Sequence, residues 1–208
     1  MNAPLKIKVC GNKEPENLVQ VCALHPEFIG FIFYEESKRF VSKPAIGFAA
    51  TDCKAKRVGV FVNASEGEIR EKVDAFNLDF VQLHGDESPE FCESISQIRP
   101  VFKAFQIDNN FNFNTLTNYL SVCYMFLFDT ASKSYGGSGK KFDWGLLSSY
   151  KGSVPFLLSG GIVPTDAASI KELEHPMLAG VDINSQFEIE HGIKDINKLK
   201  EFFKQFER

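Results

Sequence analysis

Short runs of apolar residues recur along the chain, and each is followed by a segment with the residue spacing of a helix. The runs are continuous rather than alternating, which is typical of strands that are covered on both faces. Most of them end in a small, polar or charged residue. The eight runs cover residues 7–10, 28–33, 57–62, 80–83, 101–105, 125–129, 156–159 and 180–183. The pattern predicts eight buried, parallel strands.

The segments between the runs carry helix signals. Five of them begin with a residue suited to cap a helix, namely Ser65, Ser88, Asp143, Thr165 and Asp195. Ser65 is followed three residues later by Glu68, which is the spacing of a capping box. Ser88 precedes a proline, which is favoured at the first helical position. The segment 43–50 is the weakest predicted helix, because it is short and contains a glycine.

Eight strands alternating with helices in 208 residues predict an α/β protein, a single-domain (β/α)8 TIM barrel that spans residues 1–208. No linker or change of composition divides the chain. The same alternation is compatible with a doubly wound open sheet, and the number of strands favours the barrel.

Composition and charge exclude several classes of protein. The chain has 23 Lys and Arg against 27 Asp and Glu, a net charge of −4, so it lacks the basic surface of a general nucleic-acid binder. Its 21 Phe residues allow far more burial than a disordered chain achieves. No stretch approaches the ~18 continuous apolar residues of a membrane span. We therefore expect neither nucleic acid nor a membrane as a partner.

The five cysteines lie at positions 10, 22, 53, 92 and 123, without a CxxC pair. This spacing is unlike a zinc ribbon or a disulfide framework. The first residues also lack the pattern of a signal peptide. We therefore expect a reduced, soluble, cytoplasmic protein.

Candidate chemistry lies at the carboxyl ends of the predicted strands, where barrel enzymes place their active sites. Cys10 ends the first strand, and its thiolate could act as a nucleophile or a base; the alternative is a small buried core residue. Asp129 ends the wholly apolar sixth strand, where it is either a loop cap or an acid. The segment 134–140 that follows contains three glycines and a lysine, either a loop that closes over an anion or an ordinary glycine turn.

The ends of the last two strands suit a phosphate group. Gly160 and Gly161 follow the seventh strand, and Asn184 and Ser185 follow the eighth. Main-chain N–H groups in such loops commonly hold phosphate in barrels. The four histidines have no metal-ligand spacing, and no carboxylate cluster indicates a metal.

Taken together, these motifs closely resemble the phosphoribosylanthranilate isomerase family of tryptophan biosynthesis, over nearly the whole chain. The matching motifs are KVCG at 8–11, GFIFY at 30–34, SKR at 37–39, VGVFVN at 58–63, VQLHG at 81–85, FDT at 128–130, YGGSGK at 135–140, FDW at 142–144, LSGG at 158–161 and VD at 181–182. The chain differs from the family's usual two serines and glycine after the eighth strand, where it has Asn184, Ser185 and Gln186.

The resemblance implies an Amadori rearrangement without metal or cofactor, on the small-molecule substrate N-(5-phosphoribosyl)anthranilate. It implies Cys10 as general base, Asp129 as general acid and Arg39 as the partner of the anthranilate carboxylate. The further substrate-binding residues would be Lys8, Gln82, His84 and Asp182. The phosphate would be bound by Gly160, Gly161, Asn184 and Ser185. We expect a monomer.

Two other functions are compatible with parts of the pattern. A related histidine-pathway sugar isomerase would need an aspartate where this chain has Cys10, and a second phosphate site. A non-catalytic barrel that only binds a phosphorylated metabolite is suggested by the altered eighth loop, and the presence of both Cys10 and Asp129 argues against it.

Overall fold

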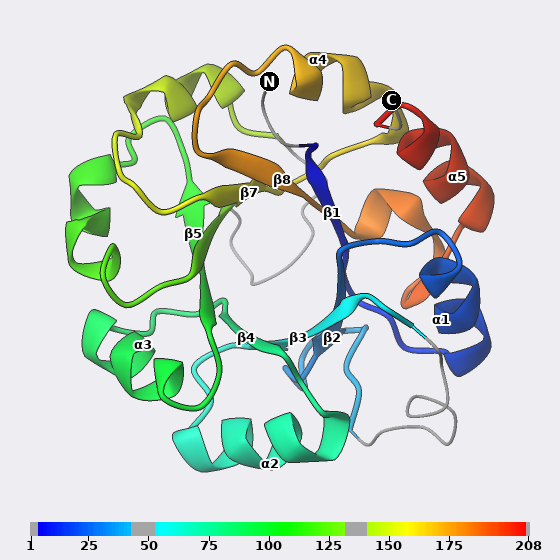
Figure 1. Cartoon of the computed structure of the whole chain (residues 1–208), viewed down its shortest axis with the longest axis horizontal. Coiled ribbons are helices and arrows are strands. Elements are labelled where there is room, and N and C mark those ends of the chain that lie inside the picture. Colours follow the sequence, from blue (N-terminus) through cyan, green and yellow to red (C-terminus); the bar gives the residue numbers. More distant parts are fainter. Residues whose placement is uncertain (1–3, 43–52, 132–140, 207–208) are drawn as a thin grey trace.

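Eight parallel strands close into a barrel, with the helices outside it (Figure 1). The structure is a computed structural model that describes residues 4–42, 53–131 and 141–206. The strands are β1 (Lys6–Val9), β2 (Phe28–Ile32), β3 (Lys56–Phe61), β4 (Phe80–Leu83), β5 (Val101–Ile107), β6 (Met125–Thr130), β7 (Phe156–Leu158) and β8 (Leu178–Ile183). Each strand overlaps its predicted run, and β1 pairs with β8. The predicted barrel is confirmed, and the open sheet is excluded.

The helices are shorter and more varied than the alternation predicted. The α-helices are α1 (Pro15–Cys22), α2 (Glu66–Phe76), α3 (Pro89–Ser96), α4 (Ala167–Lys171) and α5 (Ile196–Lys204). The 3-10 helices are η1 (Phe113–Tyr119), η2 (Trp144–Ser149), η3 (Pro164–Asp166) and η4 (Ser185–Phe187). A short antiparallel hairpin, β9 (Glu188–Glu190) with β10 (Ile193–Lys194), precedes α5. Where they are described, the segments after β5 and β6 therefore contain 3-10 turns instead of α-helices.

Four of the five predicted caps are confirmed. The Ser65 capping box is complete, and Ser88, Asp143 and Asp195 each accept a hydrogen bond from a main-chain N–H in the first turn of the following helix. The prediction for Thr165 is wrong, because this residue lies inside η3. The predicted helix at 43–50 and the glycine-rich loop at 134–140 lie outside the described residues.

The barrel interior is apolar at one end and polar at the other. Phe28 and Val58, near the starts of β2 and β3, belong to a buried apolar cluster with residues from β5, β6 and β7. Gly30 and Val60 lie two residues further along these strands, and Val60 lines a cavity. The apolar cluster closes the amino-terminal end of the barrel, so a ligand can enter only from the carboxyl-terminal end.

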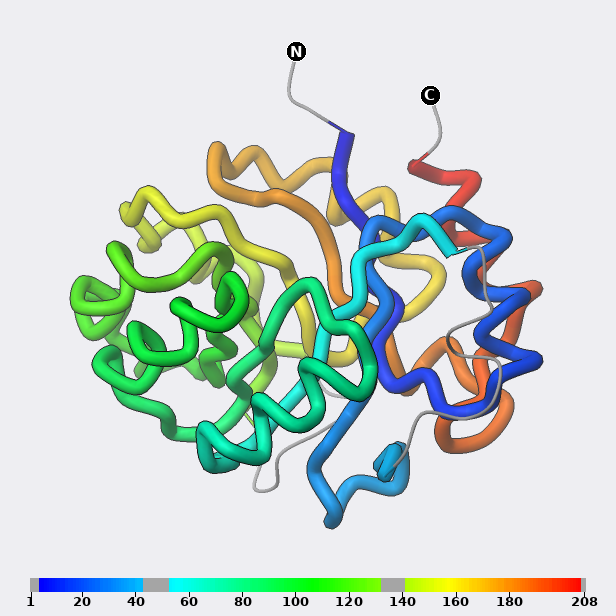
Figure 2. Tube along the Cα trace, turned by 60° about the horizontal axis from the view of Figure 1, so that its bottom comes forward, coloured from blue at the N-terminus to red at the C-terminus, as the bar shows by residue number. Residues whose placement is uncertain are grey.

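The two ends of the barrel also differ in what lies beyond them. The start of β1 and the end of α5 lie at one end, and the chain after β2 projects from the other (Figure 2). This projecting segment carries Arg39, and it is held to the barrel by a bridge between Ile32 and Phe40. Among the described residues, no helix is long and apolar enough to cross a membrane.

A disulfide joins Cys22 at the end of α1 to Cys53 ahead of β3, with a Cα–Cα distance of 5.3 Å. The prediction of a fully reduced chain is therefore wrong for these two residues. Spacing along the sequence misleads here because a helix after β1 runs back to the amino-terminal end of the barrel, which is also where β3 begins. Cys10, Cys92 and Cys123 are free and buried.

Candidate active site

A cavity that is open to solvent lies at the carboxyl-terminal ends of the strands. Ten of the eleven predicted site residues line it: Cys10, Arg39, Gln82, His84, Asp129, Gly160, Gly161, Asp182, Asn184 and Ser185. The exception is Lys8, which is fully buried behind Cys10. The topology thus brings together residues from six of the eight strand ends.

Cys10 lies at the end of β1, with its main-chain N–H donating to Ile183 on β8 at 2.9 Å. The turn that follows is held by Asn12, whose side-chain amide donates to the carbonyls of Val9 and Gly30. Gly30 on β2 leaves the space for the thiol, since a Cβ there would lie 2.8 Å from the Cys10 sulfur. The thiol therefore lies in a slot that a glycine on the neighbouring strand provides.

The surroundings of Cys10 are strongly charged. Burial raises the pKa of the Cys10 thiol; the Lys8 ammonium opposes this rise, Asp182 adds to it, and Lys194 opposes it. Lys8 donates to Asp182 at 2.8 Å, and both side chains are buried. Burial tends to lower the pKa of Lys8, but Asp182 and Cys10 outweigh that effect and raise it, so Lys8 carries a positive charge beside the sulfur.

Among the described residues, Asp129 at the end of β6 is contacted by a main-chain N–H and an imidazole. Its Oδ1 accepts a hydrogen bond from the main-chain N–H of Thr130 at 2.8 Å, and its Oδ2 lies 3.3 Å from Nε2 of His84. The Nδ1 atom of His84 lies 2.8 Å from the side-chain amide nitrogen of Gln82. With that amide donating to Nδ1, the imidazole proton is on Nε2 and is directed at Asp129.

The loop after β7 packs directly on Asp129. Gly160 and Gly161 have φ values of +86° and +64°, a region that favours glycine. A Cβ on Gly160 would collide with Thr130 and lie 2.8 Å from Oδ1 of Asp129. These glycines therefore fix the shape of the loop and let it approach the acid closely.

The loop after β8 contributes Asn184, Ser185 and Gln186 to the same cavity. The side-chain oxygen of Asn184 accepts a hydrogen bond from Lys194 at 2.8 Å, so this amide is turned towards β10. Together with Arg39 it fills the space beside Gly11, whose φ is +74° and where a Cβ would lie 2.7 Å from either side chain.

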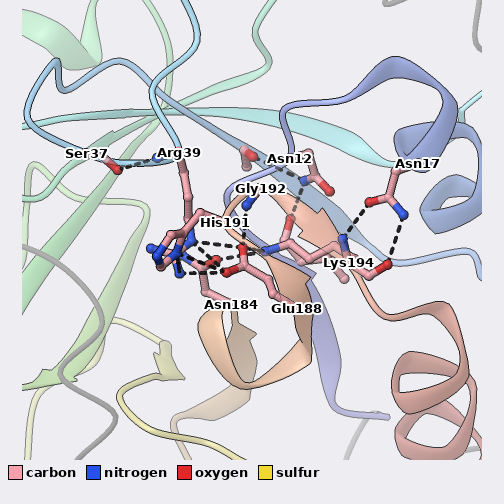
Figure 3. Close-up of polar contacts among 11 residues, drawn as sticks. Asn12, Asn17, Ser37, Arg39, Asn184, Glu188, His191, Gly192 and Lys194 are labelled. Atoms are coloured by element: carbon pink, nitrogen blue, oxygen red, sulfur yellow. Dashed lines mark hydrogen bonds and ion pairs between the residues drawn. The ribbon is translucent and has the colours of Figure 1, made fainter.

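Arg39 is held by a carboxylate that the sequence did not indicate (Figure 3). Its Nε and Nη2 atoms donate to both oxygens of Glu188 at 2.6–3.0 Å. Glu188 also accepts from Lys194 at 2.8 Å and from the N–H of Gly192 at 3.1 Å. The side chains of Glu188 and Lys194 are 4% and 0% exposed, so this ion cluster belongs to the buried wall of the site.

Comparison with known proteins decides the family. The family model described as N-(5'phosphoribosyl)anthranilate (PRA) isomerase matches residues 7–205. The chain belongs to the N-(5'-phosphoribosyl)anthranilate isomerase family. The isomerase of Parabacteroides distasonis is 50% identical over 203 residues, which cover 96% of this chain and 92% of that protein.

Solved isomerase structures share the fold. The crystal structure of phosphoribosyl anthranilate isomerase from Thermotoga maritima has a TM-score of 0.86 and 32% identity, and the match covers 97% of this chain and 98% of that one. A further isomerase structure, with a TM-score of 0.81 and 29% identity over 97% and 98% of the two chains, is in complex with reduced 1-(o-carboxyphenylamino)-1-deoxyribulose 5-phosphate. The chain is therefore an isomerase with a barrel of known type.

Sequence reasoning included Gly30 in a motif without giving it a role, and it missed Glu188 and Lys194. A glycine in an apolar strand often marks a close approach, which is the one signal that could have identified Gly30. Glu188 and Lys194 lie in a polar segment that reads as an exposed loop. Among the described residues, no group of three or more His, Cys, Asp or Glu side chains could hold a metal ion.

Proposed function

We propose that this isomerase converts N-(5'-phosphoribosyl)anthranilate into 1-(2-carboxyphenylamino)-1-deoxyribulose 5-phosphate, a step of tryptophan biosynthesis, with Cys10 as general base and Asp129 as general acid. The observation that carries the proposal is one cavity lined by a thiol, a carboxyl group, a guanidinium and the loops after β7 and β8. These are a base, an acid, a carboxylate partner and a phosphate site.

The first step is the opening of the ribose ring. Asp129 delivers a proton to the ring oxygen, the C1–O bond breaks, and the nitrogen lone pair forms the C1=N iminium. The Nε2 proton of His84 is directed at the other carboxyl oxygen and stabilises the carboxylate that remains. Asp129 must therefore carry the proton in the reactive state.

The second step removes the proton from C2, which the neighbouring iminium makes acidic. The Cys10 thiolate takes this proton, and the C2–H electron pair forms the enolamine, which tautomerises to the ketone. A protonated Asp129 with a Cys10 thiolate holds the same number of protons as a carboxylate with a thiol. The reactive state is therefore reached by moving one proton, and Lys8 favours it by stabilising the thiolate.

The two ends of the substrate would be held separately. Arg39 would pair with the flat carboxylate of the anthranilate ring, which suits a guanidinium fork. Main-chain N–H groups of the loops at Gly160, Gly161, Asn184 and Ser185 would hold the phosphate. Asp182 and Gln82 would line the floor between these ends.

The test is an assay with the unstable substrate generated in situ. Purified protein should cause a loss of anthranilate fluorescence that depends on enzyme concentration, and the Cys10→Ala variant should not. A wild-type protein that leaves the fluorescence at the buffer rate would refute the proposed reaction.

A further inference from the structure

Arg39 is the one residue expected to recognise the anthranilate carboxylate, and its guanidinium is already bound on one edge. Nε and Nη2 donate to Glu188, and Nη2 also lies 3.2 Å from Nδ1 of His191. Among the described residues, Nη1 has no hydrogen-bond partner. The bonds to Glu188 thus occupy the edge of the guanidinium that carries Nε and Nη2, and they leave Nη1 for another acceptor.

The charges of the cluster do not cancel. Arg39 and Lys194 both bond to the single carboxylate of Glu188. Burial lowers the pKa of Lys194, and Glu188 opposes this fall. The pKa of Glu188 is lowered overall: burial opposes this, and the hydrogen bond from Arg39 and the charge of Lys194 outweigh it. The cluster of Arg39, Glu188 and Lys194 therefore has two basic side chains against one carboxylate, and this excess suits one incoming carboxylate.

The cluster is also fixed in place by the surrounding main chain. Lys194 is held by both its side chain and its main chain. Its Nζ donates to Asn184 and Glu188, and its main-chain N–H and carbonyl bond to the side chain of Asn17 on α1. The N–H of Gly192 donates to the same Glu188 oxygen that receives Lys194. Figure 3 shows these bonds linking the segment after β2 to the hairpin and to α1. The guanidinium is thus anchored to a rigid part of the barrel.

We propose that Glu188, held by Lys194, is a positioning residue that aims Arg39 at the carboxylate of the substrate and so determines specificity for carboxylated arylamines. This inference rests on the proposed role of Arg39. It assigns a function to two residues of the β9–β10 hairpin that do not line the cavity. A long arginine side chain without this anchor would lose the fixed orientation that a bidentate contact requires.

The experiment compares two ligands by calorimetry. One is reduced 1-(2-carboxyphenylamino)-1-deoxyribulose 5-phosphate, and the other is the same compound without the ring carboxylate. Wild type should bind the carboxylated ligand about 10- to 100-fold more tightly, the range expected for a charged hydrogen-bonded pair. The ratio of the two affinities isolates carboxylate recognition from binding of the phosphate.

The variants separate geometry from charge. Glu188→Gln removes the carboxylate of the cluster and keeps its two basic side chains. A purely electrostatic role would then increase affinity for the carboxylated ligand. The positioning role predicts instead that the ratio of the two affinities falls at least fivefold. The double variant Glu188→Gln/Lys194→Met restores the net charge of the wild-type cluster without the anchor, and the ratio should fall to within about threefold of one. Affinity for the ligand without the ring carboxylate should stay within about threefold in both variants.

A matched control is Glu66→Gln on α2, which removes the carboxylate from an exposed bond with Arg70 and should leave the ratio unchanged. An unchanged ratio in the double variant would overturn the inference, as would equal loss of both ligands, which would mark a structural role. A wild-type ratio near one would also overturn it. If wild type shows no turnover, but its ratio of affinities is in the expected range and falls in the double variant, the positioning role of Glu188 is supported and the proposed reaction is refuted.

Discussion

The two sides of the cavity that hold the proposed base, Cys10, and the proposed acid, Asp129, are built differently. Cys10 is next to two buried cations and a carboxylate, Lys8, Lys194 and Asp182. Asp129 is next to a main-chain N–H, an imidazole and a glycine loop. Among the described residues, the base side thus has more lysine and carboxylate neighbours than the acid side.

The difference corresponds to what each group must do. A thiol becomes a base only as an anion, and buried cations offset the cost of burying that anion. A carboxyl group acts as an acid only while it carries a proton, and a cation beside it would favour the charged form. The N–H of Thr130 and the imidazole of His84 orient Asp129, which is the acid in the proposed reaction.

The largest effect should come from removing either reacting group. Cys10→Ala and Asp129→Asn should each lower kcat by about 10²–10⁴-fold, because a positioned acid or base contributes on that order. Both should still bind the carboxylated product analogue, since neither supplies its main contacts. Steady-state kinetics with calorimetry would check this, and near-wild-type kcat in either variant would contradict its assigned role.

A smaller effect should follow from adding one methyl group on the acid side. Gly160→Ala places a Cβ against Thr130 and Asp129 at a φ of +86°. The displaced carboxyl group should lose its alignment, and we expect kcat to fall about 10- to 100-fold. Gly67→Ala is the control, because a Cβ there meets nothing within 4 Å and adds helix propensity to α2. Equal kinetics in both variants would show that the loop does not position Asp129.

The charge on the base side can be tested through pH. Lys8→Met removes the cation that opposes the raised pKa of Cys10, so that pKa should rise further. At a given pH a smaller fraction of Cys10 is then thiolate, and the pH profile of its alkylation should move to higher pH, with kcat/KM near neutral pH about tenfold lower. The alkylation of Cys10 is followed by peptide mass spectrometry. An unchanged profile or a shift to lower pH would contradict this role of Lys8.

The smallest effect is expected at His84. Its Nε2 lies 3.3 Å from Asp129, slightly longer than a good hydrogen bond. His84→Gln should therefore lower kcat by less than about tenfold, because the N–H of Thr130 still orients the carboxyl group. A loss as large as that of Asp129→Asn would instead make the imidazole a reacting group and break the contrast between the two sides.

Local patterns predicted the barrel and most of the cavity because their causes are local. Apolar runs and capping residues report burial and helix starts, and residues at strand ends meet at one end of any closed parallel sheet. Cys10 and Asp129 were found in this way. The roles attached to them came from the resemblance, and they remain predictions.

The contacts that escaped prediction join distant parts of the chain. Arg39 and Glu188 are separated by 149 positions, and nothing near either residue shows that they meet. Lys194 follows an exposed turn, yet its side chain is fully buried. Buried charged residues are recognised only once the three-dimensional neighbours that neutralise them are known.

The bond between Cys22 and Cys53 has a consequence for the unfolded chain. It closes a covalent ring over a sequence separation of 31 that contains β2 and the segment with Arg39. A ring of this size lowers the conformational entropy of the unfolded state, by the equivalent of about 3–4 kcal/mol in the chain-entropy model. The redox potential of the surrounding medium therefore changes the free energy of unfolding, although neither cysteine lines the cavity. The same barrel unfolds more readily where thiols are kept reduced.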